Sequence, residues 1–162
     1  MSDHPSIRIA WLPCEEQRMH ADNSLAAATP AVDADAVYIG WVSGNRVEVI
    51  ALDHTGKLLW RRDLGAFKAL HGPGASVIVV DDVVVVTNDQ DAPDAALHGL
   101  DRKTGETRWR IARPSGQLSY ATPALRQAKD GSKELVAAIL SPVARRRREE
   151  CAAGRRPRPD AL

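Results

Sequence analysis

A tryptophan-terminated motif occurs twice in this chain of 162 residues, and its spacing constrains the fold more than any other feature. The first copy reads Ala-Leu-Asp-His-Thr-Gly-Lys-Leu-Leu-Trp and ends at Trp60. The second reads Gly-Leu-Asp-Arg-Lys-Thr-Gly-Glu-Thr-Arg-Trp and ends at Trp109, about 49 positions later. A period of this length indicates a repeat protein whose units stack on one another.

A second marker supports the same period. The sequence Ala-Thr-Pro-Ala begins at Ala28 and returns at Ala121, about 93 positions later, which is two periods of about 46 residues. Four-stranded propeller blades repeat every ~40–50 residues. The spacing therefore predicts an all-β chain, a partial β-propeller of four-stranded antiparallel blades with two full blades and part of a third.

Short Val-, Ile- and Leu-rich runs separated by turn residues predict the strands, and the frequent turn signals argue against helices. In the first unit we expect strands at 29–33, 36–42, 46–53 and 57–62. In the second we expect them at 75–80, 83–88, 96–101 and 106–112, and a third unit begins at Thr122. The predicted organisation is an irregular segment over 1–27, blade 1 over 28–65, blade 2 over 66–114, a partial blade 3 over 115–140 and a tail over 141–162. If Trp11 closes a strand, the irregular segment contains the last strand of a preceding blade.

The motif has a physical interpretation. An Asp side chain can accept hydrogen bonds from the amides of the turn that follows it, and glycine supplies the positive φ that closes such a hairpin. A tryptophan on the outermost strand can bury its ring against the neighbouring blade. The residues assigned to this structural role are Asp53, Thr55, Gly56, Trp60, Asp101, Thr104, Gly105 and Trp109.

The last 22 residues, 141–162, depart from the repeat and contain seven arginines, four of them consecutive at 145–148. Three explanations stay open from the sequence: a truncated or shifted reading frame, a disordered basic tail, and closure of the ring by association of several copies.

Composition excludes some classes of function. A net charge of +1 gives no case for nucleic-acid binding. No apolar run reaches the ~18 residues of a membrane span, and the first residues lack the apolar core of a signal peptide. Cys14 and Cys151 form no metal-binding spacing and define no disulfide framework.

In a propeller, the loop before the first strand of each blade and the loop between its second and third strands lie on the same face. This face is the usual side for ligand binding. The ligand candidates on that face, beside Trp41, are His20, Asn23, His71, Asn88, Asp89, Gln90, Asp91 and Tyr120. Asp89, Asp91 and Asp94 lack the spacing of a calcium-binding loop. No catalytic residue and no metal site are predicted.

The motif Asp-x-x-Thr-Gly-x-x-x-Trp resembles the blade signature of PQQ-type propellers, which include quinoprotein alcohol dehydrogenases and outer-membrane assembly lipoproteins of the BamB type. The resemblance implies a periplasmic or secreted scaffold without catalysis that needs no cofactor. Its partners would be a protein or a carbohydrate, with the remaining blades of a parent propeller or further copies as additional partners.

Two alternatives stay open under the same resemblance. One is a fragment of a PQQ-dependent oxidoreductase that uses PQQ and Ca²⁺, and the other is a sensor domain once attached to a kinase. Quinoprotein dehydrogenases hold the quinone beside a pair of adjacent cysteines, and this sequence has no such pair.

Overall fold

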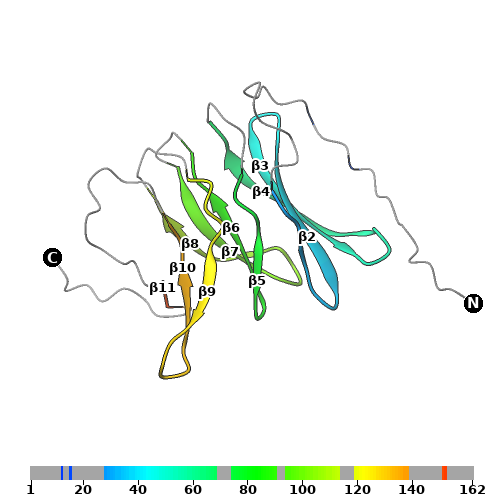
Figure 1. Cartoon of the computed structure of the whole chain (residues 1–162). Helices are drawn as coiled ribbons and strands as arrows, with labels where there is room; N and C mark the ends of the chain where they lie inside the picture. The colour runs from blue at the N-terminus through cyan, green and yellow to red at the C-terminus, as the bar shows by residue number, and fades with distance from the viewer. Residues whose placement is uncertain are drawn as a thin grey trace, which may run out of the picture.

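The computed structural model describes Leu12, Glu15, residues 28–68, 74–90, 94–113 and 119–138, and the backbone of 151–152. Within these ranges the chain is all-β and forms three antiparallel sheets that lie side by side in sequence order (Figure 1). The fold is a partial β-propeller, as the repeat predicts. The described residues include no helix long and apolar enough to cross a membrane.

The first sheet has four strands in the order of the chain. These are β1 (Ala31–Val32), β2 (Ala36–Ser43), β3 (Arg46–Asp53) and β4 (Leu58–Ala66). The second sheet repeats this order with β5 (Ile78–Val80), β6 (Val83–Asn88), β7 (Ala96–Asp101) and β8 (Thr107–Ala112). The third contains β9 (Ala124–Gln127), β10 (Lys133–Val136) and β11 (Cys151–Ala152), with β10 in the centre.

Strands predicted from the hydrophobic pattern agree with the structure best where both ends carry turn signals. The predicted strands 46–53, 83–88 and 96–101 have the observed bounds. The strand expected at 29–33 is reduced to β1 (Ala31–Val32). Pro30 has no N–H for a sheet, and the N–H of Thr29 is directed to the second sheet instead.

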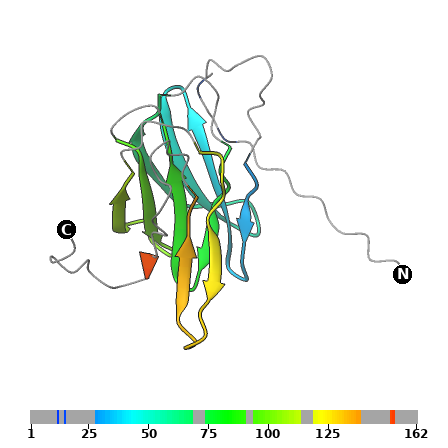
Figure 2. The same cartoon turned by 60° about the vertical axis from the view of Figure 1, so that its left-hand side comes forward.

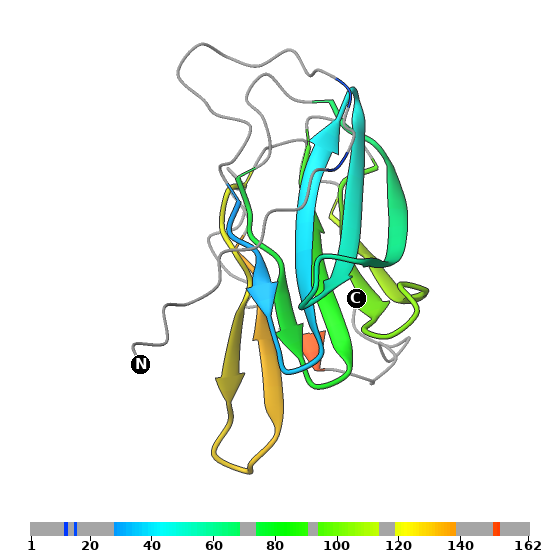
Figure 3. The ribbon, with the colours of Figure 1, turned by 90° about the vertical axis from the view of Figure 1, so that its right-hand side faces the viewer.

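The innermost strands β1, β5 and β9 lie next to one another (Figure 3), and a ladder of hydroxyl groups precedes them. The N–H of Thr29 donates to Ser76 Oγ at 2.9 Å, and the N–H of Ser76 donates to Thr122 Oγ1 at 3.0 Å. The hydroxyls of the second and third sheets therefore each accept a hydrogen bond from a main-chain N–H of the sheet before.

Neighbouring sheets face one another (Figure 2), and two of the three clusters of buried apolar side chains lie between them. A buried cluster joins Tyr38, Val49 and Trp60 of the first sheet to Val84 and Leu100 of the second. A second cluster packs Val85 and Leu97 of the second sheet against Leu135 of the third. Each sheet thus depends on its neighbour to bury its apolar face.

The two motif tryptophans pack differently. Trp60 is 8% exposed, and its ring lies so close to Gly105 of the second sheet that a Cβ there would come within 2.6 Å of it. Trp109 is half-buried and covers Gly99 of its own sheet, where a Cβ would come within 2.0 Å of the ring. Trp109 nevertheless packs against the cluster that contains Leu135 of the third sheet, so both rings contact the next sheet and Trp60 is the more deeply buried of the two.

Candidate functional site

The two ends of the sheets carry different polar groups. The hairpin turns between β1 and β2 and between β3 and β4 lie at one end, and the equivalent turns of the second sheet lie there too. The last residues of β2, β4, β6 and β8 lie at the other end (Figure 1). We refer to these as the turn end and the loop end. The sequence-based ligand candidates that the structure describes fall on the loop end, at the end of β6 and in the segment before β9.

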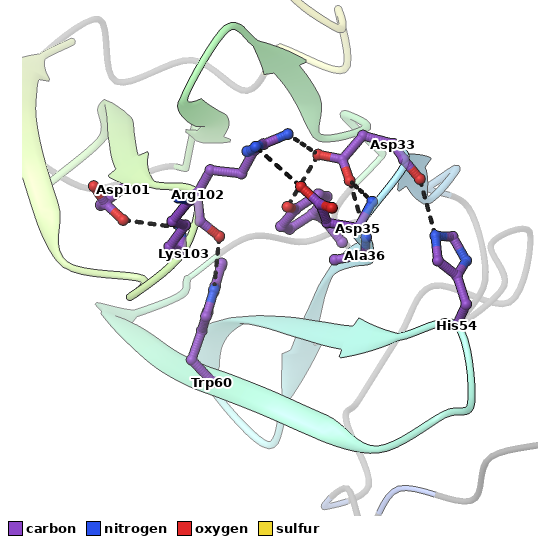
Figure 4. A network of polar contacts seen from close by, with 9 residues as sticks. Asp33, Asp35, Ala36, His54, Trp60, Asp101, Arg102 and Lys103 are labelled. Carbon is purple, nitrogen blue, oxygen red and sulfur yellow. Dashed lines mark hydrogen bonds and ion pairs between the residues drawn. The ribbon is translucent and has the colours of Figure 1, made fainter.

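At the turn end, Arg102 connects the first two sheets (Figure 4). Its guanidinium donates to Asp33 Oδ2 at 2.8 Å and to Asp35 Oδ2 at 3.1 Å. Burial tends to raise the pKa of Asp33, but bonds from the N–H groups of Asp35 and Ala36 and from Arg102 hold it below its usual value. Burial, together with a bond to Asp33, raises the pKa of Tyr38 to about 12. The network positions a turn of one sheet on its neighbour.

The motif aspartates organise the hairpin turns themselves. Asp53 Oδ1 accepts from the N–H groups of Thr55 and Lys57 at 2.8 and 3.0 Å. Asp101 Oδ1 accepts from the N–H groups of Lys103 and Thr104, both at 2.9 Å. Hydrogen bonds from Arg108, followed by these two amides, lower the pKa of Asp101 to about 2. These carboxylates are engaged by their own turns.

Gly56 and Gly105 have φ values of 88° and 72° at these turns, a region in which glycine alone is unstrained. The carbonyl of Gly105 also accepts a hydrogen bond from Arg62 of the first sheet at 2.7 Å. The motif turn therefore closes its own hairpin and contacts the preceding sheet.

At the loop end, Gln90 links the second sheet to the first. Its side-chain oxygen accepts from the N–H of Lys68 at 2.9 Å, and its Nε2 donates to the carbonyl of Ala66 at 2.9 Å. Nε2 also contacts Asn88 Oδ1 at 3.4 Å. Asn88 and Gln90 are both buried, so both lie inside the interface between the sheets rather than on an open surface.

Asp89 and Arg113 form a buried ion pair at the same end. Arg113 Nη2 lies 3.2 Å from Asp89 Oδ2, and the two side chains are 6% and 1% exposed. Burial raises the pKa of Asp89 to about 6, although the charge of Arg113 opposes this shift. Arg113 Nη2 also donates to the carbonyl of Ala138 at 2.6 Å, as does Ser119 Oγ at 3.1 Å. The pair thereby connects the second sheet to the third.

A small hollow opens beside this ion pair. Its lining includes Trp41 from the first sheet, Thr87 and Asp89 from the second, and Ser119 and Tyr120 from the segment that leads into the third. The hollow has a volume of about 20 Å³. Three of these side chains have buried polar atoms without a hydrogen-bond partner among the described residues. The atoms are Trp41 Nε1, Thr87 Oγ1 and the two carboxylate oxygens of Asp89. The hollow and the buried Asp89–Arg113 pair beside it are the candidate functional site.

Four of the eight ligand candidates can be located. Asn88, Asp89 and Gln90 follow one another at the end of β6 and are buried, whereas Tyr120 is exposed at the edge of the hollow. The other four, His20, Asn23, His71 and Asp91, lie outside the described residues, and their role stays a prediction.

Three residues that contribute to this end, Thr87, Arg113 and Ser119, were not selected from the sequence. Arg113 and Ser119 both bond to the carbonyl of Ala138. Neither carries a local signal in the sequence, because their role depends on how closely the third sheet approaches the second.

His98 lies apart from the hollow, in the centre of β7. It is buried, its Nε2 has no hydrogen-bond partner among the described residues, and burial lowers its pKa to about 4, with Arg110 adding to the effect. His98 is therefore neutral at physiological pH.

The described residues do not fit the cofactor set of a quinoprotein dehydrogenase. They contain no group of three His, Cys, Asp or Glu side chains placed to hold a metal ion. The hollow has room for about one water molecule and is far too small for a quinone. Cys14 and Cys151 are distant in the sequence.

The fold and the repeat define the class as PQQ-like propeller proteins with blades of four antiparallel strands. The family model described as outer membrane protein assembly factor BamB matches residues 11–147, and the chain belongs to this family. No curated protein matches the chain.

The solved structures that are similar to the chain include the following two. BamB from Moraxella catarrhalis is 24% identical with a TM-score of 0.43, over 68% of this chain and 33% of that one. A europium-containing methanol dehydrogenase is 22% identical with a TM-score of 0.44, over 54% of this chain and 16% of that one. The chain thus spans a third or less of the length of these proteins.

Proposed function

We propose that this chain is a binding scaffold for protein assembly in the cell envelope and has no catalysis of its own. The observation that carries the proposal is the match of residues 11–147 to the family described as outer membrane protein assembly factor BamB. The partner class that this implies is an outer-membrane protein, and the implied compartment is the periplasm.

The contacts between the sheets support a scaffold. A scaffold presents surfaces in fixed relative positions, and adjacent sheets are joined here at both ends. Arg102 bonds to Asp33 at the turn end, and Gln90 bonds to Ala66 at the loop end. Arg113 extends the loop-end contacts to the third sheet. The proposed role needs no cofactor.

A binding measurement tests the proposal. The purified chain is titrated against an unfolded outer-membrane protein that carries a fluorophore, and anisotropy is recorded. We expect saturable binding that is at least about tenfold tighter than for an unfolded water-soluble protein of similar length, equivalent to about 1.4 kcal/mol. Equal affinity for the two proteins would contradict the proposal.

A genetic experiment tests the role in the cell. Deletion of the gene in the parent bacterium should lower the amount of correctly folded outer-membrane proteins, and a plasmid copy should restore it. Unchanged amounts after deletion would argue against a role in assembly.

The oxidoreductase alternative has its own test. The full chain is mixed with PQQ and Ca²⁺, and absorbance and alcohol-dependent dye reduction are followed. The scaffold proposal predicts neither a shift of the quinone absorbance nor dye reduction. If both occur, the oxidoreductase alternative replaces it.

A further inference from the structure

The face of the first sheet that points away from the second sheet carries buried apolar side chains. Along β3, Val49 and Ala51 join the cluster shared with the second sheet. Side chains alternate between the two faces of a strand, so Ile50 and Leu52 point away from that cluster. Ile50 and Leu52 are 1% and 6% exposed, although neither belongs to a cluster of buried apolar side chains among the described residues. We refer to the face that carries them as the outer face.

The third sheet gives a comparison for this burial. Leu135 packs against the second sheet, so Val136 points away from it, as Ile50 does in the first sheet. Val136 is 47% exposed, as expected where no second layer covers a sheet. Ile50 and Leu52 therefore need a cover. Because their burial is that of one chain on its own, the cover comes from the same chain.

Glu15 brings the N-terminal part of the chain to the first sheet. Its N–H donates to Ser43 Oγ at 2.9 Å, and its carbonyl accepts from the N–H of Gly44 at 3.3 Å. Ser43 is the last residue of β2 and lies at the loop end. Trp11 precedes Glu15 by four residues, and a stretch of that length spans up to about 14 Å when extended. Trp11 is therefore within reach of the centre of β3.

Residues 7–11 have the pattern of a strand with one apolar side. They read Ile-Arg-Ile-Ala-Trp, so Ile7, Ile9 and Trp11 share one side of an extended segment. Trp11 also lies about 49 positions before Trp60, the same interval as separates the two motif tryptophans. Trp60 packs against the apolar face of the next sheet. The repeat therefore predicts the same kind of contact between Trp11 and the first sheet.

We propose that residues 7–11 form a strand that lies on the outer face of the first sheet and places its apolar side, with Trp11, against Ile50 and Leu52. The next residues along the chain, 16–24, are mostly polar and would not bury this face. Closure by the chain itself leaves the outer face unavailable to a partner, so the proposed assembly role uses another surface.

Nuclear magnetic resonance of the full ¹³C,¹⁵N-labelled chain tests the contact. The indole signals of Trp11 are identified by their loss in Trp11→Phe, and the methyl signals of Leu52 by their loss in Leu52→Met. We expect nuclear Overhauser contacts between the Trp11 ring and the Leu52 methyl groups, because packed apolar side chains approach within about 4.5 Å. The proposal is overturned if the folded chain shows no such contact.

Substitution of Trp11 provides a second measurement. Trp11→Ala should open the outer face, so that a soluble paramagnetic agent broadens the Leu52 methyl signals, which it leaves sharp in the native chain. The matched control is Arg8→Ala, on the opposite side of the segment, which should leave Leu52 protected. Trp11→Phe retains an aromatic ring and should retain the protection, also if Trp11→Ala proves poorly folded. Equal broadening in Trp11→Ala and Arg8→Ala would contradict the proposal.

A mixture of labelled and unlabelled chains distinguishes the source of the strand. A filtered experiment records only contacts between a labelled and an unlabelled chain. The proposal predicts that the contact of Trp11 with Leu52 is missing from this experiment, because each chain covers its own sheet. If the contact is present there, a second copy supplies the strand, and closure by the same chain is overturned.

Discussion

The indole Nε1–H of Trp60 donates a hydrogen bond to the main-chain carbonyl of Arg102 at 3.0 Å, across the interface between the first two sheets. The acceptor belongs to the turn of the second motif copy, so the last residue of one motif contacts the turn of the next. The ring also lies against Gly105 of the same turn. The repeated motif is therefore a self-complementary contact between consecutive sheets.

Replacement of Trp60 should destabilise the whole chain. Trp60→Ala removes a buried ring and leaves a cavity, at a cost of about 3–5 kcal/mol in the free energy of unfolding. Trp60→Phe loses the bond to Arg102 and part of the ring, at a cost of about 1–2 kcal/mol. Urea unfolding followed by circular dichroism measures both. Leu59→Ala, at a neighbouring position that is 50% exposed, serves as control and should change stability by less than about 0.5 kcal/mol.

Gly105→Ala tests the close approach of the Trp60 ring. Both Gly105 and Gly131 have positive φ, at 72° and 83°, so alanine is strained at either position by about 1 kcal/mol. A Cβ at Gly105 would come within 2.6 Å of Trp60, whereas one at Gly131 would meet open space. We expect Gly105→Ala to cost at least about 1 kcal/mol more than Gly131→Ala in urea unfolding. Equal costs would show that the ring does not depend on this glycine.

His98 should make the protein less stable in mild acid. Its pKa is about 4 in the folded state and near 6.5 when unfolded, so between these values the unfolded chain binds more protons. Stability therefore falls as pH decreases from about 6.5 to 4, by up to roughly 3 kcal/mol. The neutral variant His98→Gln should lose this dependence in urea unfolding at a series of pH values. His54→Gln, at an exposed position, should leave it intact.

Asp89 should have the opposite effect to His98 and make the protein less stable as the pH rises. Its folded pKa is about 6, above the ordinary value of 3.8, so the folded chain binds more protons between these values. Stability therefore falls as pH rises through this window, by up to roughly 3 kcal/mol. Relative to Asp89→Asn, the native chain should lose stability between pH 4 and 7. Asp94→Asn, at an exposed position, is the control. A constant difference between native chain and Asp89→Asn would contradict the prediction.

The repeat made the strands predictable because each hydrophobic run ends in a turn with its own chemistry. Asp53 and Gly56 define one such end, and the strand before them has the predicted bounds. The innermost strand of the first unit was harder to predict, because Thr29 directs its N–H to Ser76 in another sheet. Local patterns carry no information about a partner at that distance.

The polar groups of the loop end were predicted as a set, but their arrangement was not. Topology alone places Asn88, Asp89 and Gln90 at this end of the sheet. Whether they face solvent or the neighbouring sheets depends on the packing of the sheets, which no short motif encodes. The pairing of Asp89 with Arg113 and the bond of Arg102 to Asp33 both depend on that packing.

The hydroxyl ladder of Thr29, Ser76 and Thr122 gives the assembly a direction. Every link has its donor in the earlier sheet and its acceptor in the later one, so the interfaces are head-to-tail and equivalent. Duplication of a complete unit would preserve every link. Insertion of a few residues before the first strand of a unit would instead move the Ser or Thr that precedes this strand, so that its hydroxyl and its N–H would no longer reach their partners in the neighbouring sheets. Such a chain can grow or shrink in evolution by whole units, and its length is free to vary while the contacts between units stay the same.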